Sequence, residues 1–153
     1  MPTLSCGDVN LYFEDSGQGR PVLLLHGLGS SGSDWELITP ALARSFRVIV
    51  PDVRGHGRSD KPAGDYGVPL FARDVAALCA RLGIDKVDVV GLSMGGMIAF
   101  ELAVTQPALV RSLTIVNSGP DMASRAVRVL LGLRLLLLRT LGPRRLAAMV
   151  AKK

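Results

Sequence analysis

The sequence predicts an α/β protein in which a mostly parallel sheet begins with an amino-terminal β-hairpin and carries helices on its faces. Short apolar runs alternate along the chain with segments whose apolar residues recur at helical spacing, which is typical of parallel strands covered by helices. The apolar runs are β-branched or leucine-rich almost throughout, as expected of strands buried on both faces. At 153 residues the chain has the length of one compact domain.

The predicted strands follow one another from the amino terminus. The first two form a hairpin over residues 3–6 and 10–15. The four later strands read as parallel, and their sequences are PVLLLHG (21–27), FRVIVPD (46–52), KVDVVG (86–91) and VRSLTIVNS (110–118).

Three helices are predicted between these strands, over residues 33–45, 69–83 and 94–107. The second and third end at Gly83 and Pro107, which are typical stop signals. In the second helix the apolar residues, including Cys79, fall on one face, whereas Arg73, Asp74 and Arg81 lie largely off it. The other cysteine, Cys6, has no spacing to Cys79 that suggests zinc. We therefore expect two buried free thiols and no metal.

Composition and charge exclude several classes of function. With 48% hydrophobic and 20% charged residues, the chain has the composition of a globular protein. The net charge of +5 arises from residues 121–153, which hold eight Lys/Arg and one Asp. The remainder has no Lys/Arg-rich run with interleaved aromatics, so no nucleic-acid partner is predicted. The first residues, MPTLSCGDVNLYFED, show no signal-peptide pattern, and we expect a cytoplasmic location.

The basic segment changes the pattern of the chain from Met122 onward. Its apolar run LLGLRLLLL is nine residues long and contains an arginine, whereas a membrane-spanning helix needs about 20 residues. We expect a helix that packs on protein. An interfacial cationic helix is the alternative, although Arg134 falls nearly opposite Arg125 and Arg128 on a helical wheel.

A serine turn is the strongest chemical signal. Gly91-Leu92-Ser93-Met94-Gly95 follows a predicted strand directly and opens a predicted helix. A serine on such a sharp turn has a strained backbone, and glycine at 91 and 95 removes collisions with the neighbouring elements. The turn places Ser93 at the positive end of the helix and directs the Met94 N–H towards a developing oxyanion. The alternative is an ordinary glycine-rich turn without catalytic function.

The loop after the first parallel strand supplies a second candidate donor. Its sequence His26-Gly27-Leu28-Gly29 places a flexible backbone at the carboxyl edge of a buried strand, where open α/β sheets build their sites. The Leu28 N–H is the predicted donor.

Three motifs in order, HGLGSSGSDW, PDVRGHGRSDKP and GLSMGG, resemble the amino-terminal part of an α/β-hydrolase-fold serine hydrolase. The resemblance covers residues 3–120 and implies that Ser93 is the nucleophile and that Leu28 and Met94 form the oxyanion hole. Members with aspartate at the nucleophile position, such as epoxide hydrolases and haloalkane dehalogenases, are disfavoured by Ser93. The implied substrate is a small ester, lactone or related carbonyl compound, cleaved without a cofactor.

The segment PDVRGHGRSD has a mainly structural interpretation. Asp52, Arg54 and Ser59 are placed to fix the loop by hydrogen bonds. His56 is predicted on this surface loop, and His26 belongs beside the oxyanion loop. Neither histidine is expected to be the catalytic base.

In the α/β-hydrolase order, a triad acid and then a histidine follow the serine, but no histidine follows Ser93. Asp121 is the candidate acid; the alternative is a loop or helix-capping aspartate. Residues 121–153 resemble the start of a helical lid. We therefore expect a fragment of a serine hydrolase that lacks the carboxyl-terminal strands, is catalytically inefficient alone and exposes a sheet edge prone to self-association.

Three other hypotheses remain open. In the first, a second chain donates the acid and histidine; in the second, the chain is an inactive scaffold whose cationic tail binds a partner or membrane. The third is a Rossmann-type dinucleotide-binding domain, since residues 27–32 read G-x-G-x-x-G and Asp52 lies 20 residues beyond them. Against it, the loop continues to Asp34, a good N-cap, and a hairpin precedes the strand.

Overall fold

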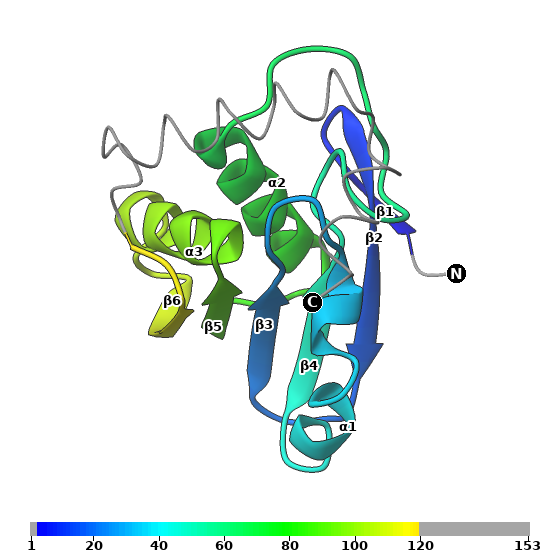
Figure 1. Cartoon of the computed structure of the whole chain (residues 1–153). Helices are drawn as coiled ribbons and strands as arrows, with labels where there is room; N and C mark the ends of the chain where they lie inside the picture. The colour runs from blue at the N-terminus through cyan, green and yellow to red at the C-terminus, as the bar shows by residue number, and fades with distance from the viewer. Residues whose placement is uncertain (1–2, 120–153) are drawn as a thin grey trace. The chain divides into compact units, whose positions relative to one another are not determined.

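A computed structural model describes residues 3–119 of the chain (Figure 1). Six strands form one sheet in the order β1-β2-β4-β3-β5-β6. The strands are β1 (Thr3–Cys6), β2 (Val9–Ser16), β3 (Pro21–Leu25), β4 (Arg47–Pro51), β5 (Val87–Leu92) and β6 (Val110–Val116). The helical elements are the 3-10 turn η1 (Gly32–Trp35) and the helices α1 (Thr39–Leu42), α2 (Val68–Arg81) and α3 (Met94–Thr105).

The strand pairing confirms the predicted fold class. β1 and β2 form the amino-terminal hairpin, and β2 runs antiparallel to β4. The pairs β3–β4, β3–β5 and β5–β6 are parallel. Strand β3 therefore lies between the two strands that follow it in the sequence, and the loops that leave β3 and β5 meet at one edge of the sheet.

Each face of the sheet has its own apolar core. On one face α2 and α3 pack side by side over the sheet and bury residues such as Leu23, Ile49, Val89, Leu78 and Ile98. The opposite face has a smaller core, in which Trp35 of η1 packs against strands β3 and β4; its other buried members are Val22, Leu24, Val48 and Val50.

The helix predicted over residues 33–45 is wrong. The structure has one 3-10 turn there, followed by the four-residue helix α1. Pro40 has no N–H to continue a helix from the preceding turn, and a new helix begins at Thr39 with Pro40 in its first turn. Leu37 is 89% exposed and Ile38 44% exposed, so these two apolar residues do not pack on the sheet, although Trp35 does. The N-cap of η1 is Ser31, not Asp34.

Helix α2 confirms most of the predicted apolar face but not the position of Asp74. Val75, Leu78 and Cys79 are buried as predicted. Asp74 is also buried, because it pairs with a buried arginine from the loop after β4. Cys6 and Cys79 are buried free thiols, and burial raises the pKa of the Cys79 thiol to about 12.

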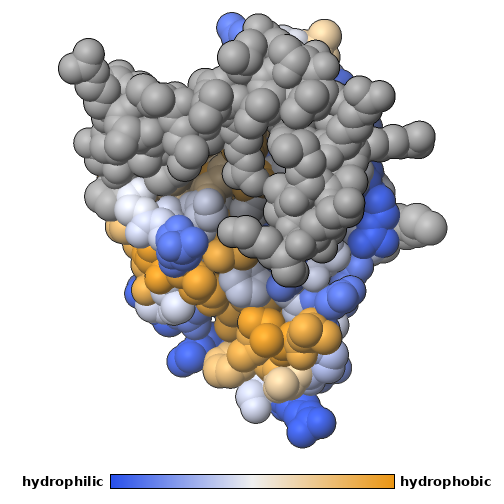
Figure 2. Space-filling view, viewed as in Figure 1, coloured by the Kyte–Doolittle hydropathy of each residue, from blue (hydrophilic) through white to orange (hydrophobic). Residues whose placement is uncertain are grey.

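Strands β5 and β6 are less buried than β3 and β4. In β5 alternate residues are buried and half-buried, whereas every residue of β6 is half-buried or exposed. Figure 2 shows apolar side chains exposed on the viewed face; exposed residues in the η1–α1 region and on β6 include Leu37, Ile38 and Val116. Within residues 3–119, no helix is long and apolar enough to cross a bilayer. The lid predicted over residues 121–153 lies outside the described residues.

Candidate active site

Ser93 occupies a strained turn between β5 and α3. Its backbone angles are φ 51° and ψ −112°, a combination that is rare for any residue other than glycine and costs about 1–3 kcal/mol. Two elements hold it there. The Ser93 N–H donates to the Val116 carbonyl at 3.0 Å, and the Ser93 carbonyl accepts the Gly96 N–H at 3.0 Å. The Ser93 side chain does not cap α3, so its hydroxyl is not used for helix capping.

The glycines around Ser93 are required by close backbone contacts. A Cβ on Gly91 would collide with the backbone of Gly95, and a Cβ on Gly95 would collide with the Leu25 carbonyl. A Cβ on Gly96 would lie 2.6 Å from the Ser118 Cβ. Strand β5, helix α3 and the end of β3 therefore meet with almost no space between their backbones, as predicted for Gly91 and Gly95.

The loop after β3 lies directly beside the serine turn. Leu25 and Gly91 are neighbours in the β3–β5 register, and a Cβ on Gly27 would lie 3.8 Å from the Ser93 Cβ. Leu28 follows in this loop and is 66% exposed. Met94 is the first residue of α3, so its N–H has no acceptor within the helix. The structure thus brings together the segments that carry all three residues predicted to bind the reacting carbonyl.

Asp34 fixes the conformation of this loop, which was not predicted from the sequence. Its carboxylate accepts the Gly27 N–H at 3.2 Å and the Ser30 hydroxyl at 2.5 Å. The loop also closes a turn through the Ser30 N–H and the Gly27 carbonyl at 3.3 Å. The sequence does indicate a fixed loop here, because Ser30 and Asp34 are short polar residues that follow His26 and Gly27 closely.

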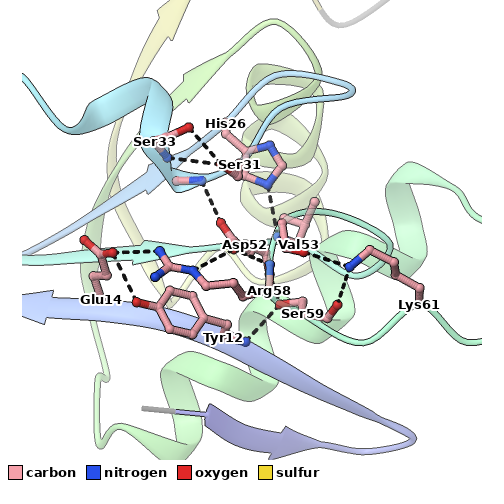
Figure 3. Close-up of polar contacts among 12 residues, drawn as sticks. Tyr12, Glu14, His26, Ser31, Ser33, Asp52, Val53, Arg58, Ser59 and Lys61 are labelled. Atoms are coloured by element: carbon pink, nitrogen blue, oxygen red, sulfur yellow. Dashed lines mark hydrogen bonds and ion pairs between the residues drawn. The ribbon is translucent and has the colours of Figure 1, made fainter. Parts of the chain in front are cut away.

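His26 is fully buried and both of its ring nitrogens are engaged. Nδ1 lies 2.8 Å from the Gly27 carbonyl, and Nε2 accepts the Val53 N–H at 3.1 Å (Figure 3). These partners require a neutral ring with its proton on Nδ1. Desolvation by burial lowers the pKa of His26. The ring is a structural link between the β3 and β4 loops and has no free nitrogen for a serine.

His56 lies in the loop after β4. Its Nδ1 is 3.0 Å from the Arg54 carbonyl, to which it donates in the neutral form. Its ring centroid lies 5.1 Å from that of His26 and 6.2 Å from that of Phe71. Within the described residues, neither histidine is hydrogen-bonded to Ser93.

Asp52 links the loop after β3 to the loop after β4 (Figure 3). Its carboxylate is 1% exposed and accepts the N–H groups of Gly32 and Arg58, each at 2.7 Å. The Arg58 guanidinium lies 3.8 Å from the same carboxylate and 3.6 Å from the centroid of the Tyr12 ring. Ser59 completes the arrangement, because its hydroxyl donates to the Asp52 carbonyl and accepts the Tyr12 N–H.

This use of Asp52 argues against the dinucleotide-binding alternative. A ribose-binding acid needs an accessible carboxylate, whereas this carboxylate is buried and bound to amides. The glycine motif is followed by a single 3-10 turn, not by the longer helix whose amino terminus would hold a pyrophosphate.

Arg54 ties the same loop to two distant elements. It forms ion pairs with Asp74 of α2 and with Asp8 of the β1–β2 turn. These carboxylates hold the pKa of Arg54 well above its usual value. Arg54 fixes the loop as predicted, but its partners were not predictable because they lie 20 and 46 residues away in the sequence.

The predicted acid Asp121 lies outside the described residues. Within residues 3–119 no group of three or more His, Cys, Asp or Glu side chains is arranged to hold a metal ion. An open groove of about 500 Å³ lies between α2 and α3, and none of the residues that line it belongs to the Ser93 turn or the loops beside it.

Comparison with known proteins connects this geometry to enzymes. The family model described as "alpha/beta hydrolase fold" matches residues 20–142. The putative carbamate hydrolase RutD of Azorhizobium caulinodans is 41% identical over 117 residues, which are 76% of this chain and 44% of that protein. The soluble epoxide hydrolase of a Corynebacterium species is 40% identical over 112 residues, 73% of this chain and 39% of that protein.

A solved structure supports the same relationship. The enol-lactonase from Burkholderia xenovorans superposes with a TM-score of 0.87 at 30% identity, over 98% of this chain and 58% of the lactonase. The first curated relatives are much longer than the matched region: the chain spans 36% of the length of some of them and 44% of the carbamate hydrolase.

Proposed function

Because the chain belongs to the α/β hydrolase fold family, we propose that Ser93 is the nucleophile of a hydrolase that cleaves an ester, a lactone or a related small carbonyl compound. The observation that carries the proposal is the strained conformation of Ser93. Strain of about 1–3 kcal/mol at one residue persists only where the surrounding structure over-determines it. Here it holds a hydroxyl at the amino terminus of a twelve-residue helix, beside a loop with an exposed backbone.

The proposed reaction proceeds through an acyl-serine. The Ser93 oxygen attacks the carbonyl carbon while its proton passes to a base, and the Leu28 and Met94 N–H groups donate to the resulting oxyanion. The tetrahedral species collapses, and the leaving oxygen takes the proton back from the base. The same base then takes a proton from a water molecule, whose oxygen attacks the acyl group. The base returns the proton to the Ser93 oxygen, and the acid product is released.

The chemistry of the nucleophile favours a carbonyl substrate. Epoxide hydrolases of this family are among the members expected to carry aspartate at the position of Ser93. We therefore propose carbonyl cleavage for this chain, although one of its relatives is named a soluble epoxide hydrolase. The names of two others, a putative carbamate hydrolase and an enol-lactonase, are consistent with attack at a carbonyl carbon.

We propose that the base comes from outside residues 3–119. His26 has no free ring nitrogen, His56 is not hydrogen-bonded to Ser93, and the sequence contains no histidine after Ser93. Asp121 remains the proposed acid within this chain. Since serine is a weak nucleophile without a base, we expect the 153-residue chain alone to react slowly, and we propose that a histidine from further polypeptide completes the site.

A fluorophosphonate probe tests both parts of the proposal. We expect slow labelling at Ser93, located by peptide mass spectrometry, and faster labelling when imidazole is added as an external base. Ser93→Ala should abolish this labelling, whereas Ser112→Ala, which changes an exposed serine on β6, should leave it unchanged. Label spread over several serines would contradict the nucleophile. Labelling of Ser93 as fast as in a full-length relative would contradict the missing base.

A further inference from the structure

We propose that Asn117 is a positioning residue for Ser93, because its left-handed backbone lets the segment at the end of β6 support both the N–H and the carbonyl of Ser93. This assignment rests on the proposed function of Ser93 as the nucleophile. It adds a residue that acts on the serine turn from a different strand and does not itself touch the substrate.

Asn117 shares an unusual backbone conformation with Ser93. Apart from glycines, two of the residues that the structure describes have a positive φ, Ser93 at 51° and Asn117 at 49°. Left-handed backbone costs free energy for most residues with a side chain, and asparagine adopts it more readily than the others. Asn117 is exposed, so packing of its side chain does not impose the conformation. We therefore ascribe the positive φ to the path that the backbone takes here.

The path starts at the last residue of β6. Val116 pairs with Leu92 in the register between β5 and β6, and the Val116 carbonyl accepts the Ser93 N–H at 3.0 Å. The chain then bends at Asn117. An extended residue at this position would carry the chain on in the direction of the strand, whereas the bend brings the next residue against helix α3.

Ser118 contacts the first turn of α3 at Gly96. A Cβ on Gly96 would lie 2.6 Å from the Ser118 Cβ and 2.7 Å from its Oγ, so only glycine leaves room for Ser118 at this point. The Ser118 hydroxyl is buried and has no hydrogen-bond partner among the described residues. Its contact with Gly96 is therefore one of packing. The Gly96 N–H in turn donates to the Ser93 carbonyl at 3.0 Å.

Residues 116–118 thus support the serine turn from two sides. The Val116 carbonyl holds the Ser93 N–H, and Ser118 packs on the glycine whose N–H holds the Ser93 carbonyl. The left-handed residue between them turns the chain so that both contacts form together. A strained residue persists only where its surroundings over-determine its conformation, and this segment is one of those determinants.

Substitution of Asn117 separates its backbone from its side chain. Asn117→Val disfavours the conformation, because a β-branched residue is a strong outlier at positive φ. Asn117→Gly accepts the same backbone but removes the amide group. Thr114→Val is the matched control, since it places the same side chain at an exposed, extended position of β6, where valine is favoured. Circular dichroism confirms that each full-length variant is folded.

Hydrogen exchange followed by NMR measures how firmly the turn is held. The amides of Ser93 and Gly96 should exchange about tenfold faster in Asn117→Val than in the unaltered chain, as the cost of a left-handed valine predicts. In Asn117→Gly and Thr114→Val the rates should stay within about twofold. Equal exchange in Asn117→Val and Asn117→Gly would show that residue 117 does not hold the turn, which would overturn the proposal.

Fluorophosphonate labelling of Ser93, with imidazole present as the base, measures the effect on the reaction. Labelling should be about threefold slower or more in Asn117→Val, and unchanged in Asn117→Gly and Thr114→Val. Unchanged labelling of Asn117→Val despite faster exchange would sink the positioning function, as would slow labelling of Asn117→Gly, which would mean that the amide itself acts at the site. Absence of label at Ser93 in the unaltered chain would refute the nucleophile instead, and the exchange rates would still decide whether Asn117 holds the turn.

Discussion

The ion pair between Arg54 and Asp74 is expected to contribute more to stability than any surface pair described above. Arg54→Met removes two hydrogen bonds from the Asp74 carboxylate, one from Nε at 2.5 Å and one from an amino group at 2.8 Å. Both side chains are 5% exposed, so water cannot replace the guanidinium. Leaving one partner of a buried pair uncompensated costs about 3–5 kcal/mol, which is a large part of the stability of a typical domain, about 5–15 kcal/mol.

The assay is urea-induced unfolding followed by the fluorescence of Trp35, the single tryptophan, which is buried. Arg54→Met should lower the free energy of unfolding by about 3–5 kcal/mol. The double variant Arg54→Met, Asp74→Leu should recover most of this loss, because no charge is then buried without a partner.

Glu14→Gln is the matched control for a surface pair. It breaks the ion pair between Glu14 and Arg58, whose side chains are both 53% exposed, and should cost less than about 1 kcal/mol. If Arg54→Met were no more destabilising than Glu14→Gln, the assignment of Arg54 as a buried anchor of the loop would be wrong.

Three further changes test other parts of the structure. Gly95→Ala should lower the free energy of unfolding by about 1–3 kcal/mol through the collision with the Leu25 carbonyl, while Gly67→Ala, with its nearest atom 3.8 Å away, should change the melting temperature little. Ser93→Gly should raise the free energy of unfolding by about 1–3 kcal/mol, measured in urea, because glycine accepts the backbone angles that strain serine; an unchanged value would show that the turn is not strained. His26 is neutral in the folded protein, and its pKa is lowered from the usual 6.5. Below about pH 6.5 the unfolded chain therefore binds a proton at His26 that the folded protein does not bind. The free energy of unfolding should fall in this range by up to about 1.4 kcal/mol per pH unit. His26→Gln should remove this contribution when urea midpoints are compared between pH 7 and pH 6.

The parts of the fold that were predictable from sequence are those in which a local pattern matches a buried surface. The strand PVLLL is apolar because both of its faces are covered, and the apolar spacing of α2 matches the face that packs on the sheet. Residues 33–45 carry a similar spacing, but Leu37 and Ile38 stay exposed, and Pro40 has no N–H for a continuous helix. Asp74 was misplaced because its burial depends on a guanidinium 20 residues away.

The same distinction holds at the site. Gly91 and Gly95 were predictable because the chemistry of a sharp strand-to-helix turn excludes side chains at these positions. The contact between Asp34 and the Gly27 N–H was not, because it depends on how the loop folds back over seven residues. Asp121 stays a prediction, and so does a cytoplasmic location.

The strand order has a consequence for biosynthesis. Strand β3 lies between β4 and β5, and both of these strands leave the ribosome after it. About 65 more residues must be made before β5 is available to pair with β3. At about 5–20 residues per second, this synthesis takes several seconds. The hydrogen bond from Ser93 to Val116 comes later still. Until β6 has been made, the Ser93 N–H lacks its acceptor, whereas the Ser93 carbonyl can already accept from Gly96 and Met97 of α3. The nascent chain can therefore relax the strained backbone of Ser93 by unwinding the turn. The finished sheet holds the backbone in place.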